Sequence, residues 1–389
     1  MNAKISSISI IGKRPCVAII GAGVIGLGIA WRLAQRAEVL LFDRGKVGLG
    51  ASHAAAGMLA ACCEAEPGEE DLVALGRDSQ ARWPGFAEEL LRASGVDVEL
   101  RQEGTLVLAV TADDQAQLAQ RLQFQQRLGL PLEWLSAAET RAKEPHLAGK
   151  IAGSVFSPDD HQVDNRKVAQ ALHIAAGAAG VAIYEERPVK EISIQGGRAA
   201  GVILEDGMTV AADRVVLAAG AWSRGIAGLP PERRPPVRPV KGQMLALRMA
   251  ATAPLLNHVL WAPGAYLVPR RDGRLIVGAT VEEKGFDDSI TAGGLLTLLE
   301  AAWRAVPALE ELPVEEIWVG HRPGSRDDAP ILGRGPLENL FYATGHYRNG
   351  ILLAPVTADA MARLIGDDAV EPAIRPFGLE RFLPAHAAE

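Results

Sequence analysis

Cysteine is scarce in this sequence, because the 389 residues include only Cys16, Cys62 and Cys63. Their number is odd, their spacing fits no metal or redox motif, and two adjacent cysteines are poorly placed to form a disulfide with each other. A chain with so few cysteines is typical of the reducing cytoplasm, where we expect this protein to act.

The sequence also lacks an excess of positive charge and any long apolar run. Lys and Arg number 40 against 47 Asp and Glu, a formal net charge of −7, which argues against a nucleic-acid surface or a polybasic membrane contact. No stretch reaches the ~20 apolar residues of a transmembrane helix, so we expect no membrane span. We expect no metal site either, since the carboxylates of residues 157–164 fit turn and helix N-cap positions better.

One stretch near the start predicts a nucleotide site. An apolar, β-prone run at residues 17–20 precedes Gly21, Gly23 and Gly26, which have the G-x-G-x-x-G spacing, and a helical pattern follows. In this arrangement the first glycine permits a tight turn, the second lets a pyrophosphate approach the backbone, and the third lets the helix pack on the strand. The N-terminus of that helix would present free N–H groups to the phosphates.

The elements that follow strengthen this prediction. A second apolar run, residues 38–42, ends at Asp43, whose carboxylate can accept hydrogen bonds from ribose hydroxyls. The small residues of Gly50-Ala-Ser-His-Ala-Ala-Ala-Gly-Met58 would let the backbone approach a bulky, flat group, and Ser52 can donate to a phosphate. The alternatives are a purely structural βαβ unit at the start of the chain and a tightly packed helix of small residues after it.

The rest of the chain alternates strand-like and helical segments without the nucleotide pattern. We predict helices at residues 70–95, 112–128, 137–144, 165–179 and 351–365, and strands at 103–110, 181–184, 214–222, 244–248, 265–269, 275–280, 315–321 and 340–344. The Pro-rich residues 235–244 would mark a crossing between two domains, and the turn at 271–274 would join two strands as a hairpin. An antiparallel sheet built this way would form the floor of a substrate site.

Seven motifs resemble those of the D-amino-acid oxidase-like flavoproteins, and within that family the glycine oxidases of the thiamine pathway. They run in the family's order over nearly the whole chain: Gly21-Ala-Gly-Val-Ile-Gly26, Ala54-Ala-Ala-Gly-Met58, Pro239-Val-Lys-Gly242, Tyr266-Leu-Val-Pro-Arg270, Val277-Gly-Ala-Thr280, Arg322-Pro-Gly324 and Gly345-His-Tyr-Arg-Asn-Gly-Ile-Leu-Leu-Ala-Pro355. The last motif is quite specific, whereas the first is shared with many nucleotide-binding proteins.

The resemblance implies an α/β fold, with a Rossmann-like FAD-binding domain and a second α+β substrate domain built on an antiparallel sheet. We assign residues 14–85, 148–226 and 319–377 to the discontinuous FAD-binding domain, and residues 86–147 and 227–318 to the substrate domain. This division follows the length of the chain, which exceeds that of one ordinary compact domain.

The resemblance also implies which residues form the site, with FAD rather than NAD as cofactor. Expected to contact FAD are Gly21, Gly23, Val24, Ile25, Gly26, Asp43, Arg44, Ser52, Ala56, Gly57, Met58, Val189, Gly220, His346, Arg348, Asn349, Gly350, Ile351 and Leu352. Expected to hold the substrate are Tyr266, Arg322 and Arg348, with no catalytic residue beyond the flavin. Since a guanidinium can fork onto a carboxylate with two charge-assisted bonds, we prefer Arg322 as the carboxylate anchor. On spacing alone it could equally be a surface arginine.

The implied activity is FAD-dependent oxidative deamination of glycine, sarcosine or a small D-amino acid to a 2-oxo acid, with oxygen reduced to hydrogen peroxide. One alternative is a flavin dehydrogenase of a secondary or D-proline-type amino acid that passes electrons to a carrier. Another is a flavin domain that acts with a macromolecule such as a tRNA, against which the acidic balance argues. Val281 stands where glycine oxidases often carry methionine, and His321 replaces an apolar residue, so we expect a shifted substrate ranking. Whether the chain forms a homo-oligomer stays open.

Overall fold

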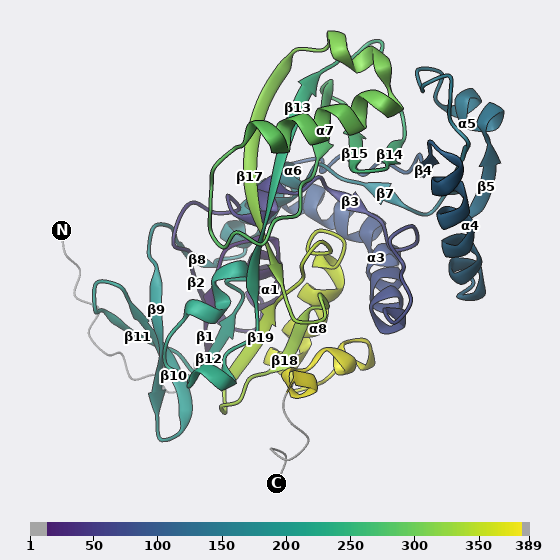
Figure 1. Ribbon diagram of the computed structural model, residues 1–389. Coiled ribbons are helices and arrows are strands. Elements are labelled where there is room, and N and C mark those ends of the chain that lie inside the picture. The colour runs from purple at the N-terminus through teal and green to yellow at the C-terminus, as the bar shows by residue number, and fades with distance from the viewer. Residues whose placement is uncertain (1–13, 383–389) are drawn as a thin grey trace.

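Two large β-sheets organise the computed structural model, which describes residues 14–382 (Figure 1). The first has six strands in the order β18-β19-β12-β1-β2-β8. Five of them are parallel, and β18 runs antiparallel at one edge. Their bounds are β1 Cys16–Ile20, β2 Glu38–Phe42, β8 Ala182–Tyr184, β12 Arg214–Leu217, β18 Ile331–Arg334 and β19 Leu340–Thr344.

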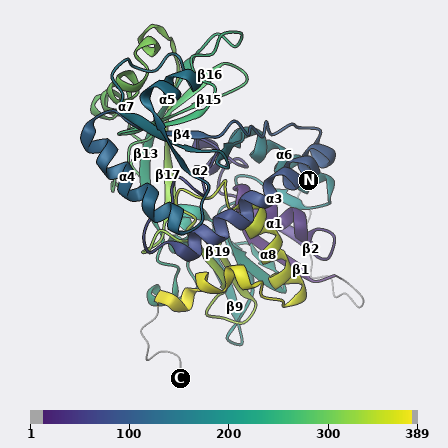
Figure 2. The ribbon, with the colours of Figure 1, turned by 90° about the vertical axis from the view of Figure 1, so that its right-hand side faces the viewer.

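Helices cover one face of the six-stranded sheet and a small sheet covers the other. On the helical face α1 packs against α6 and α8, and α3 packs behind them (Figure 2). The opposite face packs on a three-stranded antiparallel sheet. The strand residues alternate between these two cores, with Val17 and Ile19 facing the helices and Ala18 and Ile20 facing the small sheet. The bounds are α1 Val24–Leu33, α3 Glu70–Ser94, α6 Asn165–Ala178, α8 Ala354–Asp367, β9 Val189–Gln195, β10 Arg198–Leu204 and β11 Thr209–Ala211.

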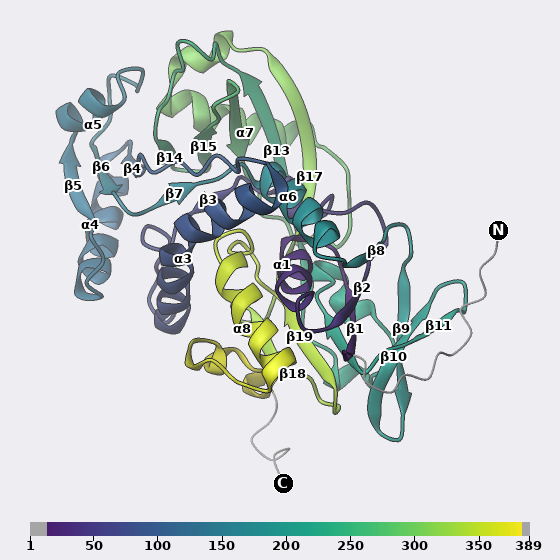
Figure 3. The same ribbon diagram turned by 180° about the vertical axis from the view of Figure 1, so that it is seen from behind.

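The second sheet has eight strands in the order β17-β13-β16-β15-β14-β4-β6-β5, and all neighbouring pairs except β4 and β14 are antiparallel. Helix α7 packs on β13, β14, β15 and β16, with the 3-10 turn η3 beside it, and α4 and α5 pack at the other end of the sheet, where β4, β5 and β6 lie (Figures 1 and 3). The bounds are β4 Thr105–Ala109, β5 Glu133–Ser136, β6 Gly153–Ser157, β13 Arg238–Arg248, β14 Val259–Ala262, β15 Ala265–Pro269, β16 Arg274–Gly278, β17 Val314–Gly324, α4 Ala112–Arg127, α5 Ala137–Lys143, α7 Ala292–Ala305 and η3 Pro307–Glu311.

Short elements complete the fold between the two sheets. The four-residue helix α2 (Ala51–Ala54) is followed by the two-residue strand β3 (Met58–Leu59), which pairs antiparallel with β7 (His161–Gln162). The 3-10 turns are η1 Gly220–Gly225, η2 Pro231–Arg233, η4 Pro372–Phe377 and η5 Leu379–Phe382. The small-residue stretch after β2 is therefore partly a tight helix and partly the extended chain that leads to β3.

The α/β fold class with an antiparallel second sheet is confirmed, and so are most of the predicted elements. The Pro-rich residues 235–244 are a correction, because most of them belong to β13 and only the first few form a connection. Pro239 lies opposite Pro323 of β17, and a pair of prolines hides the strand pattern because proline donates no ladder hydrogen bond. The closing helix α8 starts at Ala354, three residues later than expected, and α7 was not predicted.

The division into domains stays a proposal. With the proposed boundaries the strand β6 of the eight-stranded sheet falls within the segment 148–226 assigned to the FAD-binding domain, and β17 crosses the boundary at 319.

Asp164 caps α6 through hydrogen bonds from the N–H groups of Arg166 and Lys167, as the N-cap interpretation predicts.

Three negative observations apply to residues 14–382. Within this part of the chain no helix combines the length and apolarity needed to cross a membrane. No group of three or more His, Cys, Asp and Glu side chains there is arranged to hold a metal ion. The three cysteines are unbridged, and two of them, Cys62 and Cys63, are buried.

Candidate functional site

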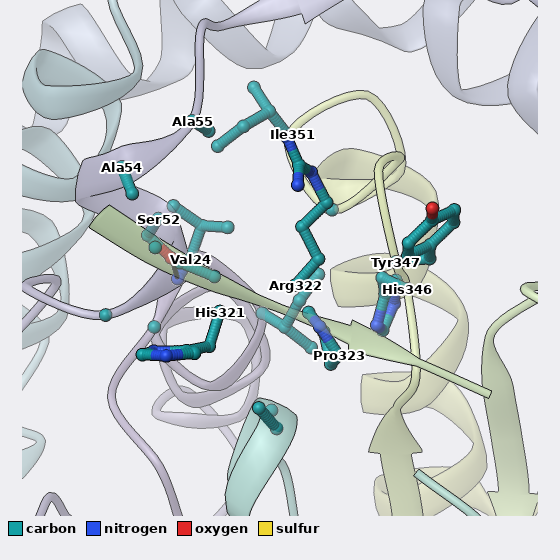
Figure 4. Close-up of a pocket in the computed structure, with 18 of the residues that line it drawn as sticks. Val24, Ser52, Ala54, Ala55, His321, Arg322, Pro323, His346, Tyr347 and Ile351 are labelled. Carbon is teal, nitrogen blue, oxygen red and sulfur yellow. Dashed lines mark hydrogen bonds between the residues drawn. The ribbon is translucent and has the colours of Figure 1, made fainter. Parts of the chain in front are cut away.

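A cavity of about 1140 Å³ runs between the two sheets and collects most of the predicted site residues. It starts at the carboxyl ends of β1, β2 and β12, where the parallel sheet meets the N-terminus of α1, and ends against β13, β15 and β17 of the second sheet. Ligands of open parallel sheets bind at this edge of the sheet. Figure 4 shows part of the lining, with Val24 and Ser52 on one side and His346 and Tyr347 on the other.

Two glycines of the first turn, Gly21 and Gly26, have no room for side chains. Gly21 has φ +105°, and a Cβ there would lie 2.4 Å from the carbonyl oxygen of Ala218. A Cβ at Gly26 would lie 1.9 Å from the Gly21 oxygen, so Gly26 keeps the helix against the turn. Gly23 borders the cavity, and the N–H of Val24 donates to Ser52 Oγ at 3.0 Å. Because Ser52 accepts this bond, its hydroxyl hydrogen stays available to donate to a phosphate.

Asp43 and Arg44 follow β2 and line the same end of the cavity. Asp43 accepts hydrogen bonds from the N–H groups of Ala22 at 2.7 Å and Gly45 at 2.8 Å, so its carboxylate ties the glycine turn to the loop after β2. A carboxylate has about four lone-pair sites, and the remaining ones suit ribose hydroxyls. The guanidinium of Arg44 lies over the ring of Trp222 at 4.6 Å from its centroid.

Tyr266 and Arg322 come together at the other end of the cavity because two glycines leave space for them. A Cβ at Gly278 would lie 2.7 Å from Tyr266 Oη, and a Cβ at Gly242 would lie 2.4 Å from Arg322 Nη1. Tyr266 projects from β15 and Arg322 projects from β17. These two strands lie on either side of the pair β13 and β16. In Figure 4 the side chain of Arg322 rises from β17 toward Ile351, away from its neighbour His321.

The surroundings of Arg322 leave its positive charge uncompensated. Its Nη1 donates to the carbonyl oxygen of Thr280 at 3.2 Å, and within residues 14–382 no carboxylate lies within ion-pair distance of it. Burial raises the pKa of Tyr266, while the nearby charge of Arg322 lowers it. A neutral phenol hydroxyl beside a free guanidinium is a set of donors that suits one carboxylate.

Arg348 has a different environment, although it also lines the cavity. Its Nε donates to Glu64, and its Nη2 donates to Glu69 Oε2 at 3.1 Å. The charges of Glu64 and Glu69 raise the pKa of Arg348 against the opposing effect of burial. Since two carboxylates already hold Arg348, its predicted role in substrate binding has less support here than that of Arg322.

The loop of residues 345–350 carries His346 and Tyr347 along the cavity wall. Burial lowers the pKa of His346 to about 3, so its ring is neutral at pH 7, and its Nε2 lies 3.2 Å from Thr357 Oγ1 of α8. Tyr347 has φ +46°, a left-handed conformation, and its N–H donates to the Pro323 oxygen at 2.9 Å. The loop is thereby attached to β17 directly beside Arg322.

Seventeen of the predicted FAD residues and all three predicted substrate residues border this one cavity. Gly26 and Leu352 do not, because Gly26 packs inside the glycine turn and the Leu352 carbonyl accepts hydrogen bonds from Ser79 and Trp83. The roles of these residues in binding stay predictions. Sequence reasoning missed Glu64 and Trp261, which also line the cavity. The indole Nε1 of Trp261 is buried without a hydrogen-bond partner within residues 14–382.

The cavity fits an FAD molecule. Its volume of about 1140 Å³ exceeds the ~300–1,000 Å³ of ordinary ligand pockets, as a dinucleotide requires. It begins at a glycine turn in which a Cβ would clash and at a helix N-terminus that suits a pyrophosphate. The small residues Ala54, Ala55 and Ala56 line it further along, where a flat ring system needs close approach of the backbone.

Comparisons with known proteins agree with this geometry. A family model described as DAO, FAD dependent oxidoreductase, matches residues 16–364. Glycine oxidase of Geobacillus kaustophilus is 39% identical over 94% of this chain and 97% of its own length. Its crystal structure superposes with a TM-score of 0.88 over 95% of this chain and 100% of that one.

Two further relatives extend the comparison. The bifunctional protein ThiO/ThiG of Synechocystis sp. is 41% identical over 94% of this chain, which spans 54% of that longer protein. The crystal structure of iminodiacetate oxidase from Chelativorans sp. BNC1 is 28% identical, with a TM-score of 0.84 over 93% of this chain and 98% of that one.

Proposed function

Because this chain belongs to the DAO family of FAD-dependent oxidoreductases, and is an FAD-dependent amino-acid oxidase, we propose that its substrate is a small amino acid. The candidates are glycine, sarcosine and a small D-amino acid, each oxidised to a 2-oxo acid with release of an amine or ammonia. Oxygen is the proposed electron acceptor and hydrogen peroxide the second product. The observation that carries this proposal is the uncompensated Arg322 beside Tyr266 in a cavity that fits FAD.

The proposal assigns a separate task to each side chain. Arg322 forks onto the substrate carboxylate, and Tyr266 donates its hydroxyl to the same group, so the α-carbon is held in one orientation. Such orientation can supply several kcal/mol toward the barrier. Bound FAD supplies the two-electron acceptor for the α-carbon hydride. The apolar side chains of Met244 and Ala279 exclude water from the space around the α-carbon.

The proposed size limit follows from the walls of this end of the cavity. Tyr266, Trp261 and Met244 pack against one another there, and the indole and phenol rings lie 5.5 Å apart. Val281 lines the rim and is 65% exposed, so it narrows the entrance less than a longer side chain would. His321 is 6% exposed and packs against Trp222 and Phe286. We therefore expect small substrates with a ranking that differs from that of glycine oxidases with methionine at the rim.

The test is peroxide formation by the purified yellow holoenzyme with glycine, sarcosine, D-alanine, D-proline and D-phenylalanine. We expect turnover of the small amino acids, with oxygen uptake equal to peroxide release. Turnover of D-phenylalanine alone would contradict the small-substrate proposal.

The alternative dehydrogenase predicts a different result in the same assay. It would reduce an artificial dye with sarcosine or D-proline but consume almost no oxygen. The relatives named glycine oxidase favour the oxidase.

A further inference from the structure

Glu64, Glu69 and Arg348 form one charged group, which we call the Glu64 cluster. Glu64 follows β3, Glu69 lies directly before α3, and Arg348 lies in the loop after β19. Both carboxylates accept hydrogen bonds from the single guanidinium. The side chains of Glu64 and Arg348 are 14% and 29% exposed and line the cavity. The cluster therefore has one more negative than positive group.

The two arginines predicted to hold the substrate thus differ in charge balance. Arg322 has no carboxylate at ion-pair distance within residues 14–382, whereas Arg348 has two. Tyr266 is influenced by both ends: burial raises its pKa, the charge of Arg322 lowers it, and the charge of Glu64 raises it again. The substrate end of the cavity therefore combines Arg322, which no carboxylate of residues 14–382 pairs with, and the carboxyl group of Glu64, and both act on Tyr266.

Other charges around Glu64 do not remove this asymmetry. Burial raises the pKa of Glu64, and the charge of Asp160 raises it further. The charges of Arg348 and Arg121 lower the pKa of Glu64. Of these groups Arg121 pairs with Glu66 at 2.9 Å, and Asp160 accepts hydrogen bonds from the N–H groups of Cys62 and Cys63. Burial is the largest of these effects, so the pKa of Glu64 lies above its usual value, while the ion pair with the Arg348 guanidinium favours the carboxylate form in which Glu64 lines the cavity.

We propose that Glu64 is a specificity residue that restricts this oxidase to amino acids with a single carboxylate; the inference rests on the function proposed above. A second carboxylate that enters the cavity meets Glu64, and the guanidinium that could neutralise it is already occupied. Like charges at short range in a poorly solvated site repel strongly. Replacing Glu64 by glutamine removes this charge and frees a donor of Arg348, so a second carboxylate would then be accepted.

Sarcosine and iminodiacetate provide a matched pair of substrates, because they differ only by a carboxylate in place of one methyl hydrogen. In the unmodified holoenzyme we expect kcat/KM for sarcosine to exceed that for iminodiacetate at least about 100-fold. Glu64→Gln should lower this ratio at least about tenfold, through a higher kcat/KM for iminodiacetate. Glu69→Gln should lower it by a smaller factor, because Glu69 is outside the cavity lining.

The matched control is Glu316→Gln. Glu316 forms a two-bond pair with Arg166, at 2.8 and 2.9 Å, and does not line the cavity. Glu316→Gln also removes a carboxylate that pairs with an arginine. It should leave the ratio of kcat/KM for sarcosine to kcat/KM for iminodiacetate unchanged. Flavin absorbance per chain verifies that each variant carries its cofactor.

Binding of two inert ethers separates this inference from the proposed function. Methoxyacetate and diglycolate mimic sarcosine and iminodiacetate, and their binding is read from the flavin absorbance without turnover. Glu64→Gln should tighten diglycolate at least about tenfold relative to methoxyacetate. If no amine is oxidised but this change occurs, the proposed function fails and the inference stands.

An unchanged diglycolate-to-methoxyacetate ratio in a flavin-loaded Glu64→Gln protein would overturn the inference. So would an unmodified protein that accepts iminodiacetate as well as sarcosine. If Glu64→Gln loses its flavin, Glu69→Gln decides, and an unchanged ratio in that variant would overturn the inference as well.

Discussion

Replacing Arg322 by alanine should abolish tight carboxylate binding and leave the folded, flavin-bearing protein intact. Arg322 lies on β17 outside the glycine turn, and its guanidinium donates to the Thr280 oxygen at 3.2 Å. Loss of that single, partly exposed bond is a small perturbation for the fold. Its remaining N–H donors are those that a ligand would use.

The size of the effect follows from the number of bonds lost. A guanidinium that forks onto a carboxylate makes two charge-assisted hydrogen bonds, each with a net contribution of about 1.5–3 kcal/mol. Removing both should cost about 3–6 kcal/mol. At about 1.4 kcal/mol per factor of ten, the dissociation constant of the carboxylate should rise roughly 10²–10⁴-fold. Arg322→Lys should recover only part of it, because an ammonium cannot fork onto both oxygens.

Gly242→Ala offers a second perturbation of the same arginine. The added Cβ would lie 2.4 Å from Arg322 Nη1, and the flexible guanidinium is the group that would shift. We expect this variant to bind a carboxylate with a larger dissociation constant than the unmodified protein, although Arg322 is still present. The assay for all three variants is titration of methoxyacetate against the flavin absorbance, together with kcat/KM for sarcosine. A dissociation constant in Arg322→Ala within about threefold of the unmodified value would refute the anchor, and Arg348 would be tested next.

Two further predictions concern the cofactor and the pH dependence of stability. Gly23→Val should yield a folded but colourless protein, because a branched side chain would fill the space at the phosphate turn; a normal flavin content would show that the pyrophosphate lies elsewhere. Burial lowers the pKa of His346 from 6.5 to about 3, so as the pH falls below 6.5 the unfolded chain gains a proton that the folded chain does not. The free energy of unfolding should then decrease by up to about 1.4 kcal/mol per pH unit. Urea unfolding at pH 6.5 and 5.5 measures this change with pH, and His346→Gln should remove the part due to His346. An equal change in both proteins would exclude His346 as the cause.

Local patterns gave the sequence prediction its successes. The strand, glycine turn, helix and second strand from Cys16 to Phe42 depend on contacts between residues close in the sequence, and the structure has them within a few residues of the predicted positions. The helix over residues 70–95 was equally clear, because Gly95 ends it in the left-handed conformation at φ +73°.

Long-range pairing explains what the sequence could not reveal. Residues 238–243 of β13 read as a proline-rich connection, and pairing with β17 makes them part of a strand. The strand predicted at 244–248 is the rest of β13, where β16 pairs on the other side. The difference between Arg322 and Arg348 is likewise invisible in the motifs, since Glu64 precedes Arg348 by 284 residues. One hint was present: Glu64 is the first charged residue after the apolar stretch that follows Met58, which places a carboxylate near the small-residue motif.

The glycines that leave space for Arg322 and Tyr266 have a consequence for the mutational robustness of this enzyme. Arg322 needs the space that Gly242 leaves, and Tyr266 needs the space that Gly278 leaves. A Cβ added at Gly320 would lie 2.4 Å from the Cβ of Ala54. A single nucleotide change converts a glycine codon to alanine, so each of these positions is one step from a disturbed site. More positions can therefore inactivate the enzyme when mutated than those that would touch the substrate. A search for new specificities must vary these glycine positions together with the side chains that they accommodate.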